Sequence, residues 1–402
     1  MFNLDDFIST YVIKRPCSMF INDIENNWGR LTERIEGKSV CVIGGAGSIG
    51  SSFIKALLPF KPSALVVVDT NENALAELTR DLRSTKENIL PEDYVTYPID
   101  FASPVFEKMF IRRGGFDIVG NFAAHKHVRS EKDIYSVEAL IRNNILNAKC
   151  LLDLLTRFPP QEYFCVSTDK AANPVNIMGA SKRIMEDVIF SYSDKFPVKT
   201  ARFANVAFSN GSLLAAFIDR MKKQQPLSAP NDVKRYFVSP EESGQICLLA
   251  CILGENRAIF FPKLAEAQMM KFDDIGTALL KVNGYEVVEC SSESEAIEKA
   301  ANLKDGSNFY PVYYADSNTS GEKPFEEFLT ENETADYDRF HSLGVIIGKP
   351  VPDKRKISVL LQQLDELFNR DITAKEDVVS VMKEYLPNFE HIETGKSLDS
   401  KM

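Results

Sequence analysis

The most reactive side chains of this sequence stand together in Ser167-Thr168-Asp169-Lys170, directly after an aromatic and β-branched run that ends at Val166. A carboxylic acid next to an amine can give and take protons when burial and mutual charge tune the two pKa values. The adjacent Thr168 hydroxyl can hold a substrate oxygen. The segment predicts proton-transfer chemistry, and a solvated loop is the simpler alternative.

Two further candidates, Met178 and Lys182, follow on the segment 177–190, where apolar residues recur at helical spacing. Being four residues apart, they share one face of the predicted helix. Asn173-Pro174 is a turn signal before this helix. The whole stretch is therefore typical of a strand, a loop and a helix, and in an open parallel sheet such a loop lies at the ligand crevice.

The preceding sequence alternates predicted strands and helices, as in a Rossmann-like doubly wound parallel sheet. The predicted strands are 39–44, 64–69, 94–99, 117–121, 161–166 and 198–202, and the main helices are 49–58, 73–82, 137–155 and 177–190.

A glycine-rich loop, 44–50, lies between the first predicted strand and helix and contains Gly44, Gly47 and Gly50. Without Cβ atoms, such a loop lets backbone N–H groups approach a pyrophosphate at the helix N-terminus. Asp69 ends the next strand and is placed to accept hydrogen bonds from an adenosine ribose. No Arg directly follows Asp69, so the pattern favours NAD over NADP.

The order Ser-Thr-Asp-Lys, Asn-Pro and Met-Gly-Ala-Ser-Lys over 167–182 closely resembles the extended short-chain dehydrogenase/reductase family. The likeness is specifically to bacterial nucleotide-sugar 4,6-dehydratases that act on UDP-N-acetylglucosamine in polysaccharide biosynthesis. Most relatives carry Tyr where this chain has Met178, and a subset is similar in having Met. The resemblance extends roughly over 38–328.

The resemblance assigns roles to three groups of residues. The implied catalytic residues are Thr168, Asp169, Lys170, Met178 and Lys182. The implied NAD-binding residues are Gly44, Gly47, Ser48, Ile49, Gly50, Asp69, Asp100, Ala123, Ala124, Asn144 and Lys182. The implied substrate-binding residues are Lys126, Asn205, Ser212 and Arg235. Asp100 as a strand-end turn residue, Asn144 as an ordinary helix residue and Arg235 in a surface ion pair are the alternatives.

The sequence departs from the family pattern at two further places. Ala204 replaces a Gly in the segment that lines the sugar nucleotide. Thr319-Ser320 stands where relatives have Arg-Pro before the segment 321–327. The missing Arg leaves open how the nucleotide is held and whether it is UDP.

Composition limits the class of protein. The 402 residues include 47 Lys plus Arg and 57 Asp plus Glu, a net charge of −10 that argues against a nucleic-acid surface. The 7 Cys show no metal or disulfide spacing and are expected to be reduced and mostly buried. His125 and His127 lack further ligands of plausible spacing, so no metal is expected. No secretion signal or membrane-spanning run is recognisable, and cytoplasmic localisation is expected.

The predicted organisation has four parts. An N-terminal extension covers 1–37, with a candidate helix at 24–35. The NAD-binding Rossmann domain, with part of the substrate site, covers 38–262. A smaller α/β substrate-side region covers 263–350, with helices at 273–283 and 293–303. The last part, 351–402, has helices at 356–369 and 374–385 and a polar tail predicted to be disordered. The family resemblance also implies a homo-oligomer.

The implied reaction removes hydride from sugar C4 to NAD, eliminates water across C5 and C6, and returns the hydride to C6. We assign Lys170 to the C5 proton and protonated Asp169 to the leaving hydroxyl, with Thr168 at the C4 oxygen. Because a thioether has no useful proton chemistry, the base that replaces Tyr is left open among Asp169, Lys182 and a water held by Thr168. A nucleotide-sugar 4-epimerase and a non-catalytic NAD-sensing protein are the alternatives.

Overall fold

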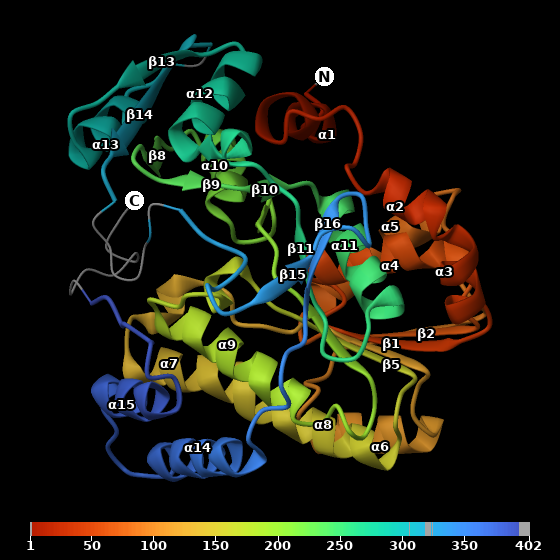
Figure 1. Cartoon of the computed structure of the whole chain (residues 1–402). Helices are drawn as coiled ribbons and strands as arrows, with labels where there is room; N and C mark the ends of the chain where they lie inside the picture. The colour runs from red at the N-terminus through yellow and green to blue at the C-terminus, as the bar shows by residue number, and fades with distance from the viewer. Residues whose placement is uncertain (1, 305, 318–322, 324, 394–402) are drawn as a thin grey trace.

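The computed structural model describes residues 2–304, 306–317, 323 and 325–393. Within them, a nine-stranded central sheet has the strand order β15-β16-β11-β6-β5-β4-β1-β2-β3 (Figure 1). Its strands are β1 Ser39–Ile43, β2 Ala64–Val68, β3 Asp93–Tyr97, β4 Ile118–Asn121, β5 Glu162–Val166, β6 Val198–Ala201, β11 Ile259–Pro262, β15 Thr334–Asp336 and β16 Leu343–Ile347. In this sheet, as far as the structure describes it, the pairs β11–β16 and β15–β16 are antiparallel and the others are parallel. The predicted Rossmann-like fold class is confirmed.

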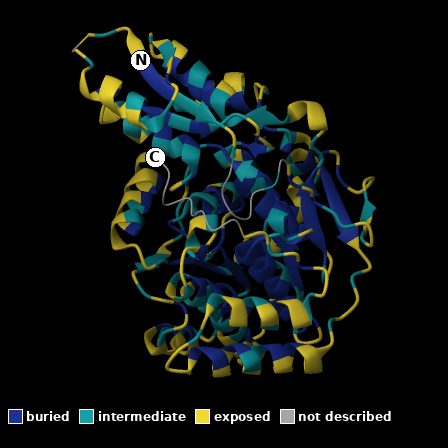
Figure 2. Cartoon of the chain, turned by 90° about the vertical axis from the view of Figure 1, so that its left-hand side faces the viewer, coloured by how far each residue is buried: buried dark blue, intermediate teal, exposed yellow. Residues whose placement is uncertain are grey.

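Helices cover both faces of this sheet, which explains why its central strands are continuous apolar runs. One face carries α3 Trp28–Ile35, α4 Ser48–Leu57, α5 Glu72–Ser84 and α11 Pro240–Leu253 (Figure 1). The other carries α6 Pro104–Arg113, α7 Ile134–Ile141, α8 Asn147–Arg157 and α9 Ile177–Phe190 (Figure 1). Figure 2 shows the buried sheet between helices whose outward faces are exposed.

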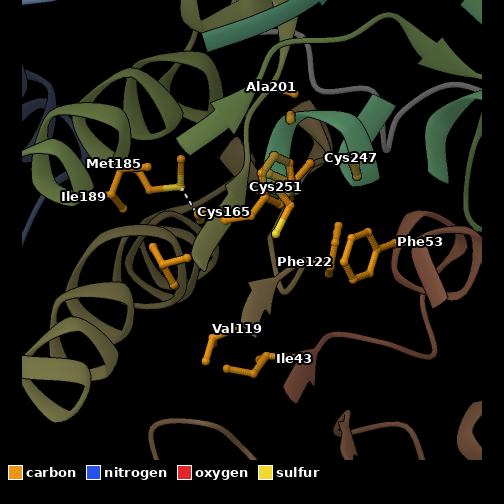
Figure 3. Close-up of a cluster of buried hydrophobic side chains, with 14 of the residues drawn as sticks. Ile43, Phe53, Val119, Phe122, Cys165, Met185, Ile189, Ala201, Cys247 and Cys251 are labelled. Atoms are coloured by element: carbon orange, nitrogen blue, oxygen red, sulfur yellow. Dashed lines mark hydrogen bonds between the residues drawn. The ribbon is translucent and has the colours of Figure 1, made fainter. Parts of the chain in front are cut away.

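The core between the central sheet and its flanking helices is apolar and contains several sulfur atoms. Figure 3 shows Phe53 of α4 facing Phe122, with ring centroids 4.9 Å apart. It also shows Cys165 of β5 meeting Met185 of α9, where the two sulfur atoms lie 3.2 Å apart. As expected, most cysteines are buried free thiols, and Cys17 and Cys150 are the exposed ones.

Two predicted helices are interrupted. The candidate at 24–35 is split into α2 Ile21–Asn26 and α3, since Asn27 leaves the helical conformation. The long helix predicted at 137–155 contains a π-helical turn, η4 Arg142–Leu146, between α7 and α8. Such turns are frequent at functional sites.

A smaller three-stranded parallel sheet has the order β13-β14-β8. Its strands are β8 Leu227–Pro230, β13 Glu286–Glu289 and β14 Phe309–Ala315, and α10 Leu213–Lys222, α12 Phe272–Val282 and α13 Glu293–Ala301 accompany it. Short pairs join β7 Asn205–Val206 to β10 Phe237–Val238 and β9 Lys234–Arg235 to β12 Met270–Lys271. The N-terminal α1 Leu4–Phe7 and η1 Ile8–Val12 add apolar side chains to the core of this unit.

This topology differs from the predicted boundaries in two ways. β8 and α10, expected in the domain 38–262 that combines NAD binding with part of the substrate site, belong to the smaller sheet, because β8 pairs with β14. β15 and β16, expected in the region 263–350, return to the central sheet beside β11. The division into four parts remains an interpretation.

The C-terminal helices α14 Lys354–Phe368 and α15 Lys375–Tyr385 lie outside α8 and α9 (Figure 1). The Tyr385 hydroxyl donates to Asp187 of α9 at 3.3 Å, and Arg142 lies over the Phe368 ring, 5.3 Å from its centre. The predicted disordered tail lies outside the described residues from 394 onward. No helix among the described residues is long and apolar enough to cross a membrane.

Candidate active site

The glycine-rich loop forms a cradle at the start of α4. A Cβ on Gly44 would lie 2.5 Å from the backbone nitrogen of Ala123, and one on Gly50 would overlap the carbonyl oxygen of Gly44. The first turn of α4 begins after Gly47, which provides no side-chain cap, so the N–H groups of Ser48, Ile49 and Gly50 point outward. The loop therefore fits a bound anion such as a pyrophosphate.

Asp69 ties this cradle to the end of β2. Its carboxylate accepts from the backbone N–H of Ala46 at 3.1 Å and of Asn71 at 3.0 Å. Asp69 is half-buried, which leaves lone pairs for ribose hydroxyls. Asp100 is different: it lies exposed beyond the end of β3 and caps a turn by accepting from the N–H of Ala102 at 2.8 Å. Asp100 thus takes part in a turn, and its role at the adenine stays a prediction.

Asn144 fixes the loop after β4 that passes the glycine cradle. From the π-helical turn it accepts from the His125 N–H and donates to the His125 carbonyl, both at 3.0 Å. It also donates to the Ser181 hydroxyl of α9 at 3.0 Å. Asn144 therefore positions Ala123 and Ala124 beside the cradle, and it is more than an ordinary helix residue.

The predicted reactive group lies at the end of β5 in a short turn, η5 Asp169–Ala171. Asp169 is 3% exposed, and one of its oxygens, Oδ1, accepts three hydrogen bonds. The donors are the Thr168 hydroxyl at 2.8 Å, the Lys170 backbone N–H at 2.9 Å and the Lys170 ammonium at 3.1 Å. All three donors therefore converge on one oxygen of the carboxyl group.

A second carboxylate, that of Glu326, approaches the same ammonium. Glu326 is 5% exposed and its Oε1 lies 3.6 Å from Lys170 Nζ and 4.0 Å from the Arg235 guanidinium. Burial acts to lower the pKa of Lys170, but the charges of Asp169 and Glu326 together have the stronger effect. The net result is a raised pKa. Burial raises the pKa of Glu326 in spite of the Lys170 charge. Four ionisable groups therefore form one cluster.

Met178 and Lys182 are both buried on α9, at 2% and 4% exposure. The Met178 backbone N–H donates to Glu131 at 2.9 Å, so the start of α9 is held independently of the Met side chain. Lys182 Nζ lies 3.2 Å from the Met185 sulfur, and burial lowers the pKa of the Lys182 amine. A lowered pKa makes the neutral amine more accessible as a proton acceptor.

A cavity of about 600 Å³ opens beside Lys170 and is lined by all four predicted substrate residues. The amide nitrogen of Asn205 is buried there and has no hydrogen-bond partner among the described residues. Ser212 caps α10 by accepting from the Ala215 N–H at 3.2 Å. Burial lowers the pKa of Lys126, whose ammonium lies 3.5 Å from the Ser209 hydroxyl.

Sequence reasoning missed five charged residues that line this cavity, namely Arg129, Arg220, Glu293, Asp316 and Glu326. Burial and the charge of Arg129 lower the pKa of Arg220, so the two guanidinium groups act on each other. The signal available for Glu326 was its place in the family-like segment 321–327. The departure at Thr319-Ser320 lies outside the described residues, as do 321, 322 and 324 of that segment.

Metal binding has no candidate in the described part of the chain, where no group of three or more His, Cys, Asp or Glu side chains could hold an ion. His125 and His127 do not converge on further ligands, and burial lowers the pKa of both imidazoles.

Comparison with known proteins points to one family. The chain matches the family described as polysaccharide biosynthesis protein over residues 40–346. It is 27% identical to a Methanocaldococcus jannaschii protein named uncharacterized membrane protein MJ1061, with 86% of this chain and 96% of that protein covered. Identity to the probable polysaccharide biosynthesis protein EpsC of Bacillus subtilis is 26%, covering 90% of this chain and 55% of EpsC. The chain thus spans about half the length of EpsC.

A Campylobacter jejuni UDP-N-acetylglucosamine 4,6-dehydratase (inverting) is 26% identical, with 63% of this chain and 74% of that enzyme covered. Among solved structures, Pen from Bacillus thuringiensis has a TM-score of 0.64 at 19% identity, covering 88% of this chain and 98% of Pen. A Bacillus cereus UDP-glucuronic acid 4-epimerase, solved with UDP-glucuronic acid and NAD, has a TM-score of 0.55 at 15% identity. The match covers 87% of this chain and 100% of that enzyme. These structures establish the likeness of fold.

Proposed function

Because this chain belongs to the polysaccharide biosynthesis protein family, whose enzymes are of the nucleotide-sugar dehydratase and epimerase type, we propose that it is an NAD-dependent nucleotide-sugar 4,6-dehydratase. The proposed substrate is a UDP-N-acetylhexosamine, with UDP-N-acetylglucosamine as the first compound to test. The product would be a 4-keto-6-deoxy sugar nucleotide for a surface polysaccharide or glycan.

The observation that carries this proposal is the Asp169–Lys170 pair beside the cavity. Elimination of water across C5 and C6 needs one group to take the C5 proton and another to protonate the C6 hydroxyl. The two side chains supply both roles and are joined by a 3.1 Å hydrogen bond. Thr168, whose hydroxyl is 2.8 Å from Asp169, would hold the sugar C4 oxygen.

The glycine cradle and Asp69 would hold NAD through its pyrophosphate and adenosine ribose, and Lys182 would bind the nicotinamide ribose. Bound NAD would supply hydride acceptance from C4 and hydride return to C6. Since the Met178 thioether is too weak a base to accept a proton, we assign the C4 hydroxyl proton to the neutral amine of Lys182, whose pKa is lowered by burial.

In the proposed elimination, Lys170 is the base at C5 and Asp169 is the acid at C6. The unliganded site holds the proton on Lys170, so one proton must first pass to Asp169 along their hydrogen bond. Substrate entry displaces water from the cavity and weakens the solvation of the ion pair, which favours this transfer.

The deciding experiment incubates purified protein with UDP-N-acetylglucosamine and follows the mass of the sugar nucleotide. A product lighter by one water, and reducible by borohydride as a 4-ketone is, would support the dehydratase. A product of unchanged mass with inverted C4 would instead support the 4-epimerase, the activity named for the Bacillus cereus neighbour. Binding of NAD without any product would favour the NAD-sensing alternative, which the Met at 178 keeps open.

Homo-oligomer formation is also part of the proposal. Since α14 and α15 lie outside α8 and α9, subunits that pair through sheet-flanking helices would have to use a face that these two helices leave open (Figure 1). Light scattering at micromolar concentration tests this, and a monomer would contradict it.

A further inference from the structure

Glu326 is a buried carboxylate beside the reactive pair that the proposed reaction does not use. It comes from the segment after β14, far from β5 in sequence, and is 5% exposed. Its Oε1 lies 3.6 Å from the ammonium of Lys170, on which Asp169 Oδ1 also acts at 3.1 Å. Lys170 therefore lies between two carboxylates. Of these two, Asp169 also accepts a hydrogen bond from the Thr168 hydroxyl.

We propose that Glu326 is a positioning residue that controls whether the proton shared by Asp169 and Lys170 can leave Lys170. This rests on the proposed dehydratase function of the same site. When Glu326 is ionised, two negative charges hold the proton on Lys170. When Glu326 is protonated, one of these charges is gone, and transfer to Asp169 leaves no net charge on any of the three side chains.

The proton balance of the elimination follows from this state. The Lys170 N–H bond breaks as an O–H bond forms on Asp169, so both charges disappear together. After C4 has been oxidised, the Lys170 lone pair takes the C5 proton and the C5–H electrons form the C5–C6 double bond. The C6–O bond breaks, and the hydroxyl leaves as water with the proton from Asp169. The Asp169–Lys170 ion pair is thereby restored.

Charged groups of both signs surround Lys170 and Glu326 and can shift their pKa values. Lys170 faces Asp169, Glu326 and Arg235, and Glu326 faces these groups and Lys323. Burial raises the pKa of Glu326, which moves its titration toward the range in which an enzyme works. Asp169 differs from Glu326 in its partners, because its Oδ1 accepts three hydrogen bonds.

The first test measures Lys170 itself and needs no turnover. Purified protein is labelled with trace acetic anhydride across a pH series, and acetylation of Lys170 is measured by peptide mass spectrometry. Glu326→Gln removes one negative charge, so Lys170 should titrate at lower pH, and at a fixed pH below its midpoint should label about tenfold faster. Glu327→Gln is the matched control, because Glu327 is exposed and contacts Asn173.

Equal titration of Lys170 in the wild type and Glu326→Gln would overturn the proposal, as would an equal shift in Glu327→Gln. The second test is the pH profile of kcat for the 4-keto product. In the wild type, kcat should fall as pH rises through the titration of Glu326, and Glu326→Gln should lose that fall while keeping measurable turnover. An unchanged profile would also overturn the proposal. If the wild type forms no product, the proposed function fails, and the labelling result still decides the role of Glu326.

Discussion

The proposed cofactor side and the proposed substrate side of this site, called here the cofactor side and the substrate side, are built in different ways. On the cofactor side, Gly44, Gly50 and Asp69 act through backbone geometry, and their contacts lie mostly within one β-α-β unit. On the substrate side, Lys170 and Glu326 act through charge and come from segments that meet only in the folded chain. The first kind of site is encoded locally, whereas the second depends on long-range packing.

The difference also affects how each side should respond to mutation. A cradle made of backbone N–H groups binds the dinucleotide more weakly when one supporting group is removed. The protonation states of the ionisable side chains in the site do not change. A charge cluster redistributes its protons when one member changes, because each pKa depends on the others. Binding variants should therefore be found on the cofactor side, and kcat and pH variants on the substrate side.

The largest effect is expected at the reactive pair. Lys170→Ala and Asp169→Asn should each lower kcat for the 4-keto product by about 10²- to 10⁴-fold, because each removes one proton transfer. Binding of the sugar nucleotide, measured by calorimetry, should remain within a few-fold of the wild type. Full turnover by the double variant would remove both residues from the mechanism.

The next effect is on the cofactor side. Asp69→Ala should weaken NAD binding about 10- to 100-fold, the value of one or two charge-assisted hydrogen bonds. Asp81→Ala is the control, because Asp81 forms an exposed ion pair with Lys55 on the same face of the sheet. Isolated wild-type protein should already contain NAD, since the reaction returns the cofactor unchanged. Protein without dinucleotide and without affinity for NAD would contradict the cofactor assignment.

A smaller effect is expected from the cavity cations that sequence reasoning missed. Arg129→Gln should raise KM for the sugar nucleotide about tenfold with little change in kcat, because a guanidinium that lines the cavity can bind phosphate oxygens. Lys132→Gln, an exposed cation three residues further on and outside the cavity lining, is the control. If both variants raise KM equally, Arg129 acts only through long-range charge and not through a contact with the phosphate oxygens.

The sequence predicted the cofactor side well for the same reason that this side is local. The glycine spacing, the strand before it and Asp69 after it lie in one continuous stretch, and each has a direct structural counterpart. Asp100 resembled Asp69 in standing near a strand end, but it caps a turn because β3 ends earlier, at Tyr97. Both acids accept from the backbone N–H two residues further on, and Asp69 also accepts from the N–H of Ala46 in the glycine-rich loop.

The substrate side could be predicted only in part. Asp169 and Lys170 were recognisable from their order, and the start of α9 at Ile177 was predicted to the residue. Glu326 stands in the family-like segment 321–327, but its contact with Lys170 could not be predicted, because a spacing of more than a hundred residues carries no information about contact. The return of β15 and β16 to the central sheet was missed likewise, since strand pairing across such a distance is decided by packing.

The smallest effect is predicted at Met178, where the two sides meet. Met178→Leu should keep kcat within about threefold of the wild type, because it preserves apolar volume in a buried position and changes no proton chemistry. The backbone N–H that donates to Glu131 is also unaffected by the exchange. The measurement is kcat for the 4-keto product, with thermal stability as the control for packing.

Met178→Tyr distinguishes an adapted site from a lost one. A phenol on the same helix face as Lys182 would restore the proton acceptor found in most relatives, so it should create turnover only if the natural protein is silent for lack of that group. We expect the natural protein to be active, because Lys182 is buried with a lowered pKa and Asp169 and Lys170 are in contact. A silent natural protein activated by Met178→Tyr would contradict the assignment of the C4 proton to Lys182. Silence in both forms, with NAD bound, would show that the reactive pair is not used for dehydration.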